Sequence, residues 1–444
     1  MLPQRHRRLA GVGTALVLLL FPSEGAAQSL TLEEAIRLSL ERNERAQIAK
    51  LQVEAAEGEL ETARSEFLPT LTLGASVTAR PTKEQDPEEE GAERRAQPVF
   101  TSGATLTLRQ PLLNPSALPS YRSAGHSLEA AKHGSTEDRR ALAYDTSRAF
   151  VQVLAAERVV RAAEARLDRA KANLDNAQAR AEAQLNSSND ATRARLDMAS
   201  AARDVAQSKG NLARGRLDLR LLIGQDVVAP LAPPEALSRS AEAFAGDASR
   251  LTRAAVDQRS DVKAAHEQAL AFRAAAEEPL YRLVPSIDLV GQVQANPDPM
   301  SGESWHDESV SLQLSWTIFD GGARYGIHRT RAAQAAAAAL EERRLLRSID
   351  NDVQAAVVAL DTARATLQVA EAAMATARAN SEETEVLYQQ GLARAIELTD
   401  ANARRFEAEV NLASARLDVA DAYLQVRFAQ GLPPVDAASG AGRR

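Results

Sequence analysis

The feature that most constrains the fold is a long helical run in the second half of the chain. Residues Ala323–Gln390 contain no proline, and Gly326 is their single glycine. Alanine, leucine, arginine, glutamate and glutamine dominate this run, and all of them favour a helix. At about 1.5 Å per residue, the 68 residues would form a helix roughly 100 Å long. An ordinary globular core does not need a helix of this length, so we expect a function that requires an elongated molecule.

An alternating segment leads directly into this helix. From Val310 onward, apolar residues occupy every second position until the chain reaches Asp320, Gly321 and Gly322. A period of two predicts a β-strand over about 308–319. The two glycines predict a sharp turn from strand to helix, because glycine tolerates conformations that other residues avoid.

The same pattern occurs twice along the chain. Pro69 and Pro285 each precede an alternating segment and stand 216 residues apart, and Gly224 and Gly431 each end a proline-free segment and stand 207 apart. Self-similarity of this kind indicates two copies of one structural unit. We predict repeat 1 over 28–229, a connector over 230–246 and repeat 2 over 247–432. The expected strands are about 68–80, 99–110, 284–295 and 308–319, and the expected long helices are about 117–184, 190–223, 323–390 and 395–430.

Both termini lie outside the repeats. Residues 1–27 combine a basic start, the apolar stretch Leu9–Phe21 and small residues before Gln28, which is typical of a cleaved signal peptide. An uncleaved anchor is the alternative, although a 13-residue stretch is too short to span a bilayer comfortably. Residues 433–444, rich in small residues and proline, predict a disordered tail. The chain has no cysteine, so neither a disulfide nor a lipid-attachment cysteine is possible.

Charge and composition narrow the classes of function. The formal net charge is −7, and loss of three arginines and one glutamate with the signal peptide, a net +2, would leave −9. This acidic balance argues against nucleic-acid binding. The six histidines are scattered, and no motif of a metal site, a cofactor site or a catalytic nucleophile occurs. We therefore expect no metal, no cofactor and no enzymatic activity.

The four alternating segments share one pattern of faces. Each presents apolar residues on one face and Thr, Ser or Gln on the other, which is typical of a membrane barrel with lipid outside and water inside. Open strand edges are not tolerated in lipid, so further copies of the chain must close such a barrel. Two copies would give eight strands with a filled interior, and three would give twelve with a pore. Aromatic residues suited to the membrane interface are Phe100, Trp305 and Trp316. A soluble sheet with one buried face is the alternative.

Several short segments occur in a familiar order. They are Leu32-Glu-Glu-Ala35, Leu68-Pro69, Trp316-Thr-Ile-Phe-Asp-Gly-Gly322, Tyr388-Gln-Gln-Gly391 and Ala420-Asp-Ala-Tyr-Leu424. In this order, and with the duplication, the chain resembles the TolC family of outer-membrane efflux proteins over residues 30–432. The resemblance implies an α+β membrane protein with four antiparallel barrel strands and two long coiled-coil helical hairpins per chain. Three chains would complete a 12-strand β-barrel and a 12-helix α-barrel.

The resemblance also points to the turn between the last two helices. Glu397 and Asp400 are three residues apart and hence on one helical face, where the family places acidic rings at the pore entrance. Stacked carboxylate rings favour cations. Tyr388 matches a family position that holds the entrance closed through polar contacts, and Gly391 and Arg394 belong to the same turn. Ordinary exposed carboxylates beside a helix start are the alternative.

The corresponding turn of the first repeat departs from the family pattern. Residues 186–190 read Asn-Ser-Ser-Asn-Asp and include no glycine. Asp190 lies in this turn, and Arg193 occupies the position of Asp400 by the 207-residue offset. The resemblance therefore does not identify the partner residues of a closing network in this chain.

These observations predict a passive exit duct in the outer membrane of a Gram-negative bacterium, with most of the chain in the periplasm. The resemblance implies a homotrimer in outer-membrane lipid that docks to a periplasmic adaptor (membrane fusion) protein and an inner-membrane pump of RND or ABC type. Tripartite efflux and type I secretion both stay open, as does the substrate: a drug, a metal ion or a secreted protein. The alternative from another class is a soluble periplasmic coiled-coil scaffold without channel activity.

Overall fold

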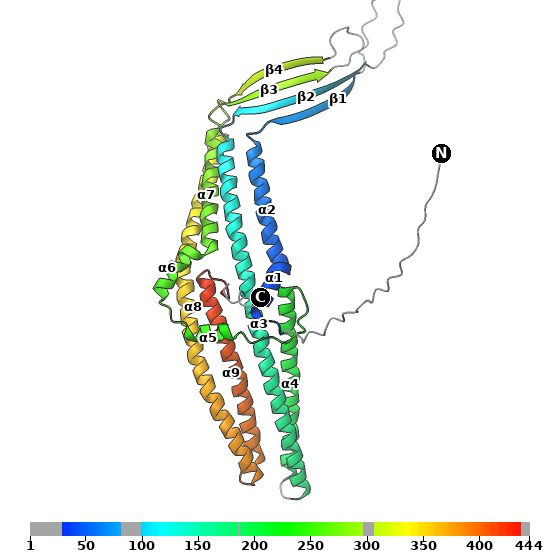
Figure 1. Ribbon diagram of the computed structural model, residues 1–444, viewed down its shortest axis with the longest axis vertical. Coiled ribbons are helices and arrows are strands. Elements are labelled where there is room, and N and C mark those ends of the chain that lie inside the picture. Colours follow the sequence, from blue (N-terminus) through cyan, green and yellow to red (C-terminus); the bar gives the residue numbers. More distant parts are fainter. Residues whose placement is uncertain (1–28, 81–98, 185–186, 296–305, 437–444) are drawn as a thin grey trace, which may run out of the picture.

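The computed structural model describes residues 29–80, 99–184, 187–295 and 306–436. The predicted signal peptide, Trp305 and the last residues of the tail lie outside these ranges. The described chain is elongated, with a β-sheet at one end and the tips of two helical hairpins at the other (Figure 1). The predicted α+β architecture with long helical hairpins is confirmed.

One antiparallel sheet contains all the described strands. These are β1 (Thr70–Arg80), β2 (Val99–Leu113), β3 (Ser286–Ala295) and β4 (His306–Ser315). They pair in chain order, so β2 of the first repeat lies beside β3 of the second. The register keeps apolar residues on one face, because Leu106 of β2 stands opposite both Leu73 of β1 and Val293 of β3. This apolar face is uncovered, with Leu73 73% exposed and Val310 79% exposed.

The last strand is shorter than its sequence pattern predicts. The alternation continues through Ile318, yet β4 ends at Ser315. Its partner β3 begins only at Ser286, after a proline, and Ser286 already pairs with Ser315. Later residues therefore have no strand to pair with, and Trp316 instead donates its indole Nε1–H to the carbonyl oxygen of Leu283 at 3.0 Å. The prediction of a strand reaching 319 is wrong at this end.

The second strand is longer than predicted and joins the two repeats. β2 continues past 110 to Leu113 through a register shift between Pro111 and Leu113, where its partner has one residue fewer. Beside this irregularity, Nη2 of Arg109 lies 2.5 Å from Oδ2 of Asp288, whose carboxylate is buried. Both residues stand on the polar face, so this ion pair links β2 and β3 across the repeat boundary.

Two long hairpins and several short helices make up the rest. The helices are α1 (Leu32–Arg42), α2 (Glu44–Ser65), α3 (Ala117–Glu182), α4 (Ser188–Ile223), α5 (Glu235–Ala243), α6 (Ala248–Gln258), α7 (Ser260–Tyr281), α8 (Ala323–Gln389) and α9 (Ala395–Ala429). α3 with α4 and α8 with α9 form the predicted hairpins, and α3 and α8 have 66 and 67 residues. Among the helices described, none combines the length and the apolar character needed to cross a bilayer.

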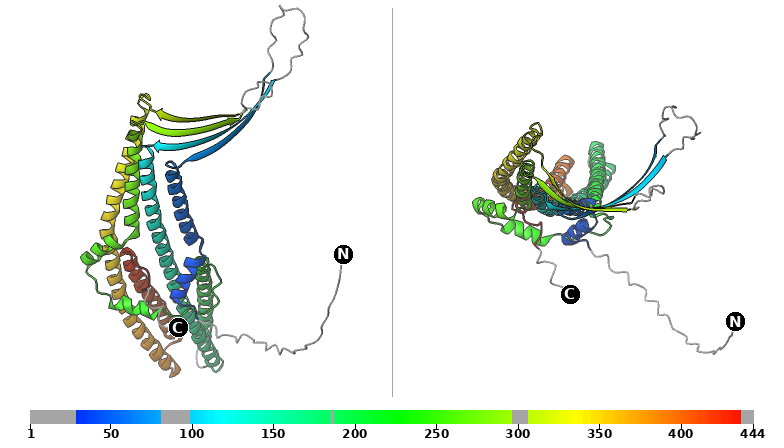
Figure 2. Two further views of the ribbon diagram at one scale, coloured as in Figure 1. Left: turned by 45° about the horizontal axis from the view of Figure 1, so that its top comes forward. Right: turned by 90° about the horizontal axis from the view of Figure 1, so that it is seen from above.

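The helices continue the order of the strands. α2 leads into β1, β2 into α3, α7 into β3 and β4 into α8. Neighbours in this order pack together, namely α2 with α3, α3 with α7 and α7 with α8. Toward the tips, α4 packs beside α3 in place of α2, and α9 lies between α3 and α8 in place of α7 (Figure 1). Sheet and helices therefore form one curved wall (Figure 2).

At mid-height, the end of one helix meets the start of another. Asn43 caps α2 by accepting a hydrogen bond from the N–H of Arg45 at 2.9 Å. Its Nδ2 donates to the carbonyl oxygens of Leu221 and Leu222 at the end of α4, at 3.3 and 3.0 Å. A single buried amide thus satisfies backbone groups of both helix ends, which would otherwise lack partners.

The second repeat builds the same joint from a different side chain. Arg259, 216 residues after Asn43, precedes α7 and lies against Gly431 at the end of α9. Gly431 has φ +79°, and a Cβ there would lie 3.0 Å from the backbone nitrogen of Arg259. The guanidinium of Arg259 pairs with Asp261 at 2.6 Å and with Asp352 of α8 at 3.2 Å. The joint is conserved between the repeats although its chemistry changes.

The main apolar core surrounds these joints. Its largest fully buried side chains include Leu32, Phe150, Leu219, Ile223, Ile349, Leu360 and Leu424. The predicted connector is more than a link, because it contains α5, which buries Leu237 in this core. The start of the predicted disordered tail is also bound, since Asp436 pairs with Arg427 at 2.5 Å and Val435 packs on the core. The tail prediction is therefore wrong for residues 433–436, and 437–444 lie outside the described residues.

The wall has two open sides. β1 and β4 are the edge strands, and no described strand covers either of them. Exposed apolar side chains also follow the helices at both sides: Ile48, Leu51, Leu196, Leu217 and Leu221 on α2 and α4, and Leu340, Val358, Val369 and Val386 on α8. These nine side chains are 51 to 74% exposed. These two sets of side chains are the apolar stripes of the wall.

Candidate functional site

The tip of the second hairpin reverses direction at a glycine. Gly391 follows α8 with φ +77°, a conformation that glycine adopts at little cost. The N–H groups of Leu392 and Ala393 both donate to the carbonyl oxygen of Leu387, at 2.8 and 3.3 Å. These bonds satisfy the end of α8 while the chain turns into α9. The predicted helix break at Gly391 is therefore the actual turn.

Tyr388 lies buried beneath this turn. Its side chain is 2% exposed and packs on Ala395 and Leu398 at the start of α9. Arg180 of α3 lies over the Tyr388 ring, 4.9 Å from its centroid, and donates from Nη2 to the carbonyl oxygen of Gln389 at 2.8 Å. The Tyr388 hydroxyl is buried and has no hydrogen-bond partner among the described residues. The guanidinium of Arg180, and not this hydroxyl, ties the two hairpins together at their tips.

Glu397 and Asp400 are exposed on the first turns of α9. Glu397 accepts a hydrogen bond from the backbone N–H of Arg394 at 3.1 Å, and its other oxygen lies 3.1 Å from Nε of the same arginine. These interactions hold the pKa of Glu397 below its usual range. Asp400 pairs with Nε of Arg404 at 3.0 Å. Each carboxylate thus has its own arginine, and Glu397 also caps the helix.

The tip of the first hairpin has a different construction. α4 begins at Ser188, two residues earlier than predicted, and Ser187 caps it by accepting from the N–H of Asn189 at 3.2 Å. Asp190 lies in the first turn of α4. Burial raises the pKa of Tyr388, the charge of Arg180 lowers it, and the charge of Asp190 adds to the increase.

Arg193 is exposed, and no described hydrogen bond or ion pair involves it. Asp400, which Arg193 matches by the 207-residue offset, is instead paired with Arg404. The two matched positions therefore differ in their contacts.

The passage from strand to helix is held by one aspartate. Oδ1 of Asp320 accepts from the N–H of Gly322 at 3.0 Å, and Oδ2 accepts from the N–H and Nε of Arg324 at 3.1 and 2.9 Å. Arg324 also donates to the carbonyl oxygen of Thr317 at 2.7 Å. Gly321 and Gly322 have φ values of +69° and +87°. The predicted turn residues therefore act together, and the hydrogen bond from Arg324 is the main reason that the pKa of Asp320 lies below its usual range.

The predicted interface aromatics stand at different places. Phe100 lies near the start of β2 and pairs with Ala79 of β1. Trp316 directly follows β4 and is 54% exposed. The third, Trp305, lies outside the described residues.

Sequence patterns did not reveal the interactions between the hairpins. Arg180 contacts a residue 209 positions later in the chain, and no local motif marks it. Arg166 of α3 is buried between Asp197 and Asp204 of α4, and Phe406 of α9 lies 5.2 Å from its guanidinium. An arginine on a helix of small residues does not indicate such a contact, because arginine is mostly found on solvated faces.

Comparisons with known proteins settle the family. The family model described as outer membrane efflux protein matches residues 35–225 and 251–432, which is most of the chain and both repeats. The chain belongs to the outer membrane efflux protein family. This confirms the resemblance to the TolC family that the sequence motifs indicated. The outer membrane protein TolC of Vibrio cholerae serotype O1 is 27% identical over 136 residues, so the chain spans 31% of that relative.

Solved structures share the fold over nearly the whole chain. CusC, whose structures describe folding and transmembrane channel formation, gives a TM-score of 0.78 at 16% identity. The match covers 97% of this chain and 99% of the CusC chain. The CmeC outer membrane channel of Campylobacter jejuni gives 0.75 at 17% identity, with 91% and 87% covered. The MtrE outer membrane channel of Neisseria gonorrhoeae gives 0.73 at 19%, with 90% and 89% covered. CmeC and MtrE are both described as outer membrane channels.

Proposed function

We propose that this efflux family member acts as a passive exit duct through the outer membrane. Three copies stand side by side, so that their sheets close a barrel of twelve strands and their helical walls close a tunnel of twelve helices. Substrate enters between the hairpin tips in the periplasm and leaves through the barrel. The chain supplies no chemical energy, so an inner-membrane pump must drive transport.

The observation that carries this proposal is the combination of an uncovered apolar face with two uncovered strand edges. Leu71, Leu73, Val310 and Leu312 are each at least 66% exposed on one face of the sheet. In water such a face would be unstable, and in lipid the unpaired backbone groups of β1 and β4 would cost several kcal/mol each. Closure with further copies in a membrane removes both costs.

The helices support the same arrangement. The apolar stripe on α2 and α4 lies on the β1 side of the wall, and the stripe on α8 lies on the β4 side. One copy can therefore place its β1 side against the β4 side of the next. Such head-to-tail contacts generate a closed ring when the rotation between copies closes.

The partners follow from the position of the tips. A periplasmic adaptor (membrane fusion) protein would join the tips to a pump of RND or ABC type, in tripartite efflux or type I secretion. The predicted signal peptide over 1–27 would deliver the chain across the inner membrane. The substrate is a drug, a metal ion or a secreted protein, since a passive duct makes few specific contacts with its cargo.

A matched pair of substitutions tests the barrel. Leu312 lies on the apolar face and Ser311, its neighbour in β4, lies on the polar face. Leu312→Arg should prevent recovery of trimers from the outer membrane, because arginine facing the middle of the bilayer costs about 2–4 kcal/mol in each copy. Ser311→Arg should assemble and change only the single-channel conductance in planar bilayers. Wild-type protein recovered as a soluble periplasmic monomer would sink the duct and favour a coiled-coil scaffold.

The carboxylates of the tip are proposed to set ion preference at the entrance. Glu397 and Asp400 would form two stacked rings in a trimer. Their pairing with Arg394 and Arg404 weakens the field that a passing ion meets. Asp400→Asn should therefore lower the preference for cations, and Arg404→Gln should raise it, as measured by reversal potentials in a salt gradient. Equal selectivity in wild type and both variants would rule out a role for this ring.

A further inference from the structure

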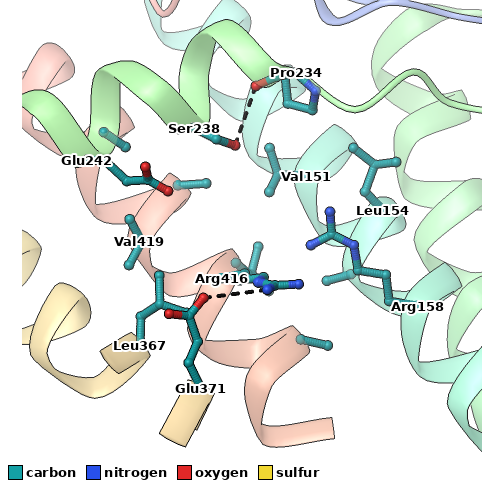
Figure 3. A pocket seen from close by; sticks show the side chains of 15 residues that line it. Val151, Leu154, Arg158, Pro234, Ser238, Glu242, Leu367, Glu371, Arg416 and Val419 are labelled. Atoms are coloured by element: carbon teal, nitrogen blue, oxygen red, sulfur yellow. Dashed lines mark hydrogen bonds and ion pairs between the residues drawn. The ribbon is translucent and has the colours of Figure 1, made fainter. Parts of the chain in front are cut away.

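A cavity of about 280 Å³ lies at mid-height of the wall, far from both the sheet and the tips. Its walls come from α3 of the first hairpin, α8 and α9 of the second, and the connector helix α5 (Figure 3). Apolar side chains form much of the lining: Val151, Leu154, Leu367, Leu417 and Val419. The cavity thus lies where both repeats and the connector meet, beside the main core.

Four charged side chains also line the cavity, and two of them form an ion pair with each other. Arg416 of α9 lies 3.5 Å from Oε1 of Glu371 on α8. Glu242 of α5 is exposed, and its carboxylate lies on the opposite side of the cavity from Arg158 (Figure 3). Arg158 of α3 has no hydrogen bond and no ion pair in the part of the chain that the structure describes.

The surroundings of Arg158 are unfavourable to its charge. The side chain is partly buried, and its guanidinium points toward that of Arg416 (Figure 3). Burial lowers the pKa of Arg158, and the charges of Arg416 and Arg161 lower it further. An arginine remains protonated in such a place, and the five N–H donors of Arg158 find no acceptor among the described side chains, so water or a bound anion must supply one. A partly desolvated cation of this kind is normally balanced by an anion.

We propose that this cavity binds a small organic anion, whose carboxylate contacts Arg158 and whose apolar part contacts Leu154 and Val419. A guanidinium and a carboxylate can form two parallel hydrogen bonds, which gives such a pair both strength and orientation. The volume lies just below the usual range for sites of drug-sized ligands, so the ligand must be small. The apolar lining selects an organic anion over a fully hydrated inorganic one.

A ligand in this place would join the two hairpins. It would contact α3, α9 and α5 at once. Because it binds the folded chain alone, it would stabilise this packing in proportion to its concentration. This inference does not depend on the exit-duct proposal, since the cavity is complete within one chain.

The first experiment uses the purified full-length protein in detergent and three probes. Benzoate has the required charge and apolar body, benzamide has the same shape without the charge, and inorganic phosphate has the charge without the apolar body. Thermal unfolding and isothermal titration calorimetry should show a rise in Tm and saturable binding with benzoate, and much weaker effects with the other two. Benzoate affinity should fall as salt is raised, because chloride screens and competes with the anion. Equal effects of benzoate and benzamide, or no binding of benzoate, would overturn the proposal.

Three variants locate the site. Arg158→Gln keeps a side chain of similar polarity but removes the charge, and should weaken benzoate binding by about tenfold or more. Arg161→Gln is the control for a purely long-range charge effect, because Arg161 is exposed and outside the cavity lining although its charge reaches Arg158; it should weaken benzoate binding far less than Arg158→Gln. Glu242→Gln removes an anion from the cavity wall and should tighten binding. Unchanged benzoate affinity in Arg158→Gln would refute the assignment even if the wild type binds.

Discussion

Arg180 is the side chain that we expect to control how firmly the two hairpin tips are attached. It donates to the carbonyl oxygen of Gln389 at 2.8 Å and lies 4.9 Å from the centre of the Tyr388 ring. The hydrogen bond contributes about 1 kcal/mol and the cation–π contact about 0.5–1 kcal/mol at a partly exposed site. Arg180→Ala should therefore weaken the attachment by about 1.5–2 kcal/mol, which shifts an equilibrium between joined and separated tips by about 10–30-fold.

Single-channel recording in planar bilayers measures this shift as the fraction of time spent in the conducting state. Arg180→Ala should raise that fraction, and Arg180→Lys should have an intermediate effect because lysine keeps the charge but not the planar group. Arg193→Ala is the matched control, since Arg193 is an exposed tip arginine without a described hydrogen bond or ion pair. Thermal unfolding of all three variants should stay close to that of the wild type.

Tyr388→Phe provides the refutation. The Tyr388 hydroxyl is buried without a partner among the described residues, so its removal should leave the tip closed or slightly more stable. If Tyr388→Phe opened the channel and Arg180→Ala did not, the Tyr388 hydroxyl, and not the Arg180 guanidinium, would hold the tips together.

Three further predictions concern the mid-height joints, with the tip glycine Gly391 as a comparison. Asn43→Asp keeps the acceptor that caps α2 but loses the donor to α4, and it places a negative charge beside carbonyl oxygens. Urea unfolding should therefore show a free energy of unfolding lower by about 1–3 kcal/mol. An unfolding midpoint equal to that of the wild type would contradict this role of Asn43. Gly391→Ala and Gly431→Ala should each lower the free energy of unfolding by about 1–2 kcal/mol, because both positions have a positive φ. At Gly431 the loss should be about 1–3 kcal/mol larger, because the backbone of Arg259 occupies the space of a Cβ. Equal losses in urea unfolding would exclude the clash with Arg259. Burial raises the pKa of Asp261, but the hydrogen bond and charge of Arg259 outweigh burial and hold that pKa below its usual range. The pair of Asp261 with Arg259 therefore stabilises the fold at neutral pH. This stabilisation is lost as the pH falls from the ordinary pKa of aspartate toward the lowered value. Asp261→Asn should lack this part of the acid sensitivity, and parallel acid-unfolding curves for the variant and the wild type would count against it.

The local pattern of the sequence determined the elements and their order. Strand alternation and proline-free helical runs placed the hairpins to within two residues at each end, because periodicity reports which face of an element is apolar. The duplication and the ordered motifs indicated the family. They also placed Tyr388, Gly391, Glu397 and Asp400 together at one tip, because these residues are close along the chain and need no long-range contact to be near each other.

The tertiary structure decided what depends on neighbours distant in sequence. β4 ends at Ser315 because β3 offers no further pairing partner, although the alternation itself continues. The same side-chain position holds Asn43 in one repeat and Arg259 in the other, and only the approach of α4 and α9 explains both. The tie from Arg180 spans 209 residues, and the cavity around Arg158 draws on four separate helices. Periodicity carries no information about such contacts, because it describes one element at a time, whereas each of these features is formed by two or more.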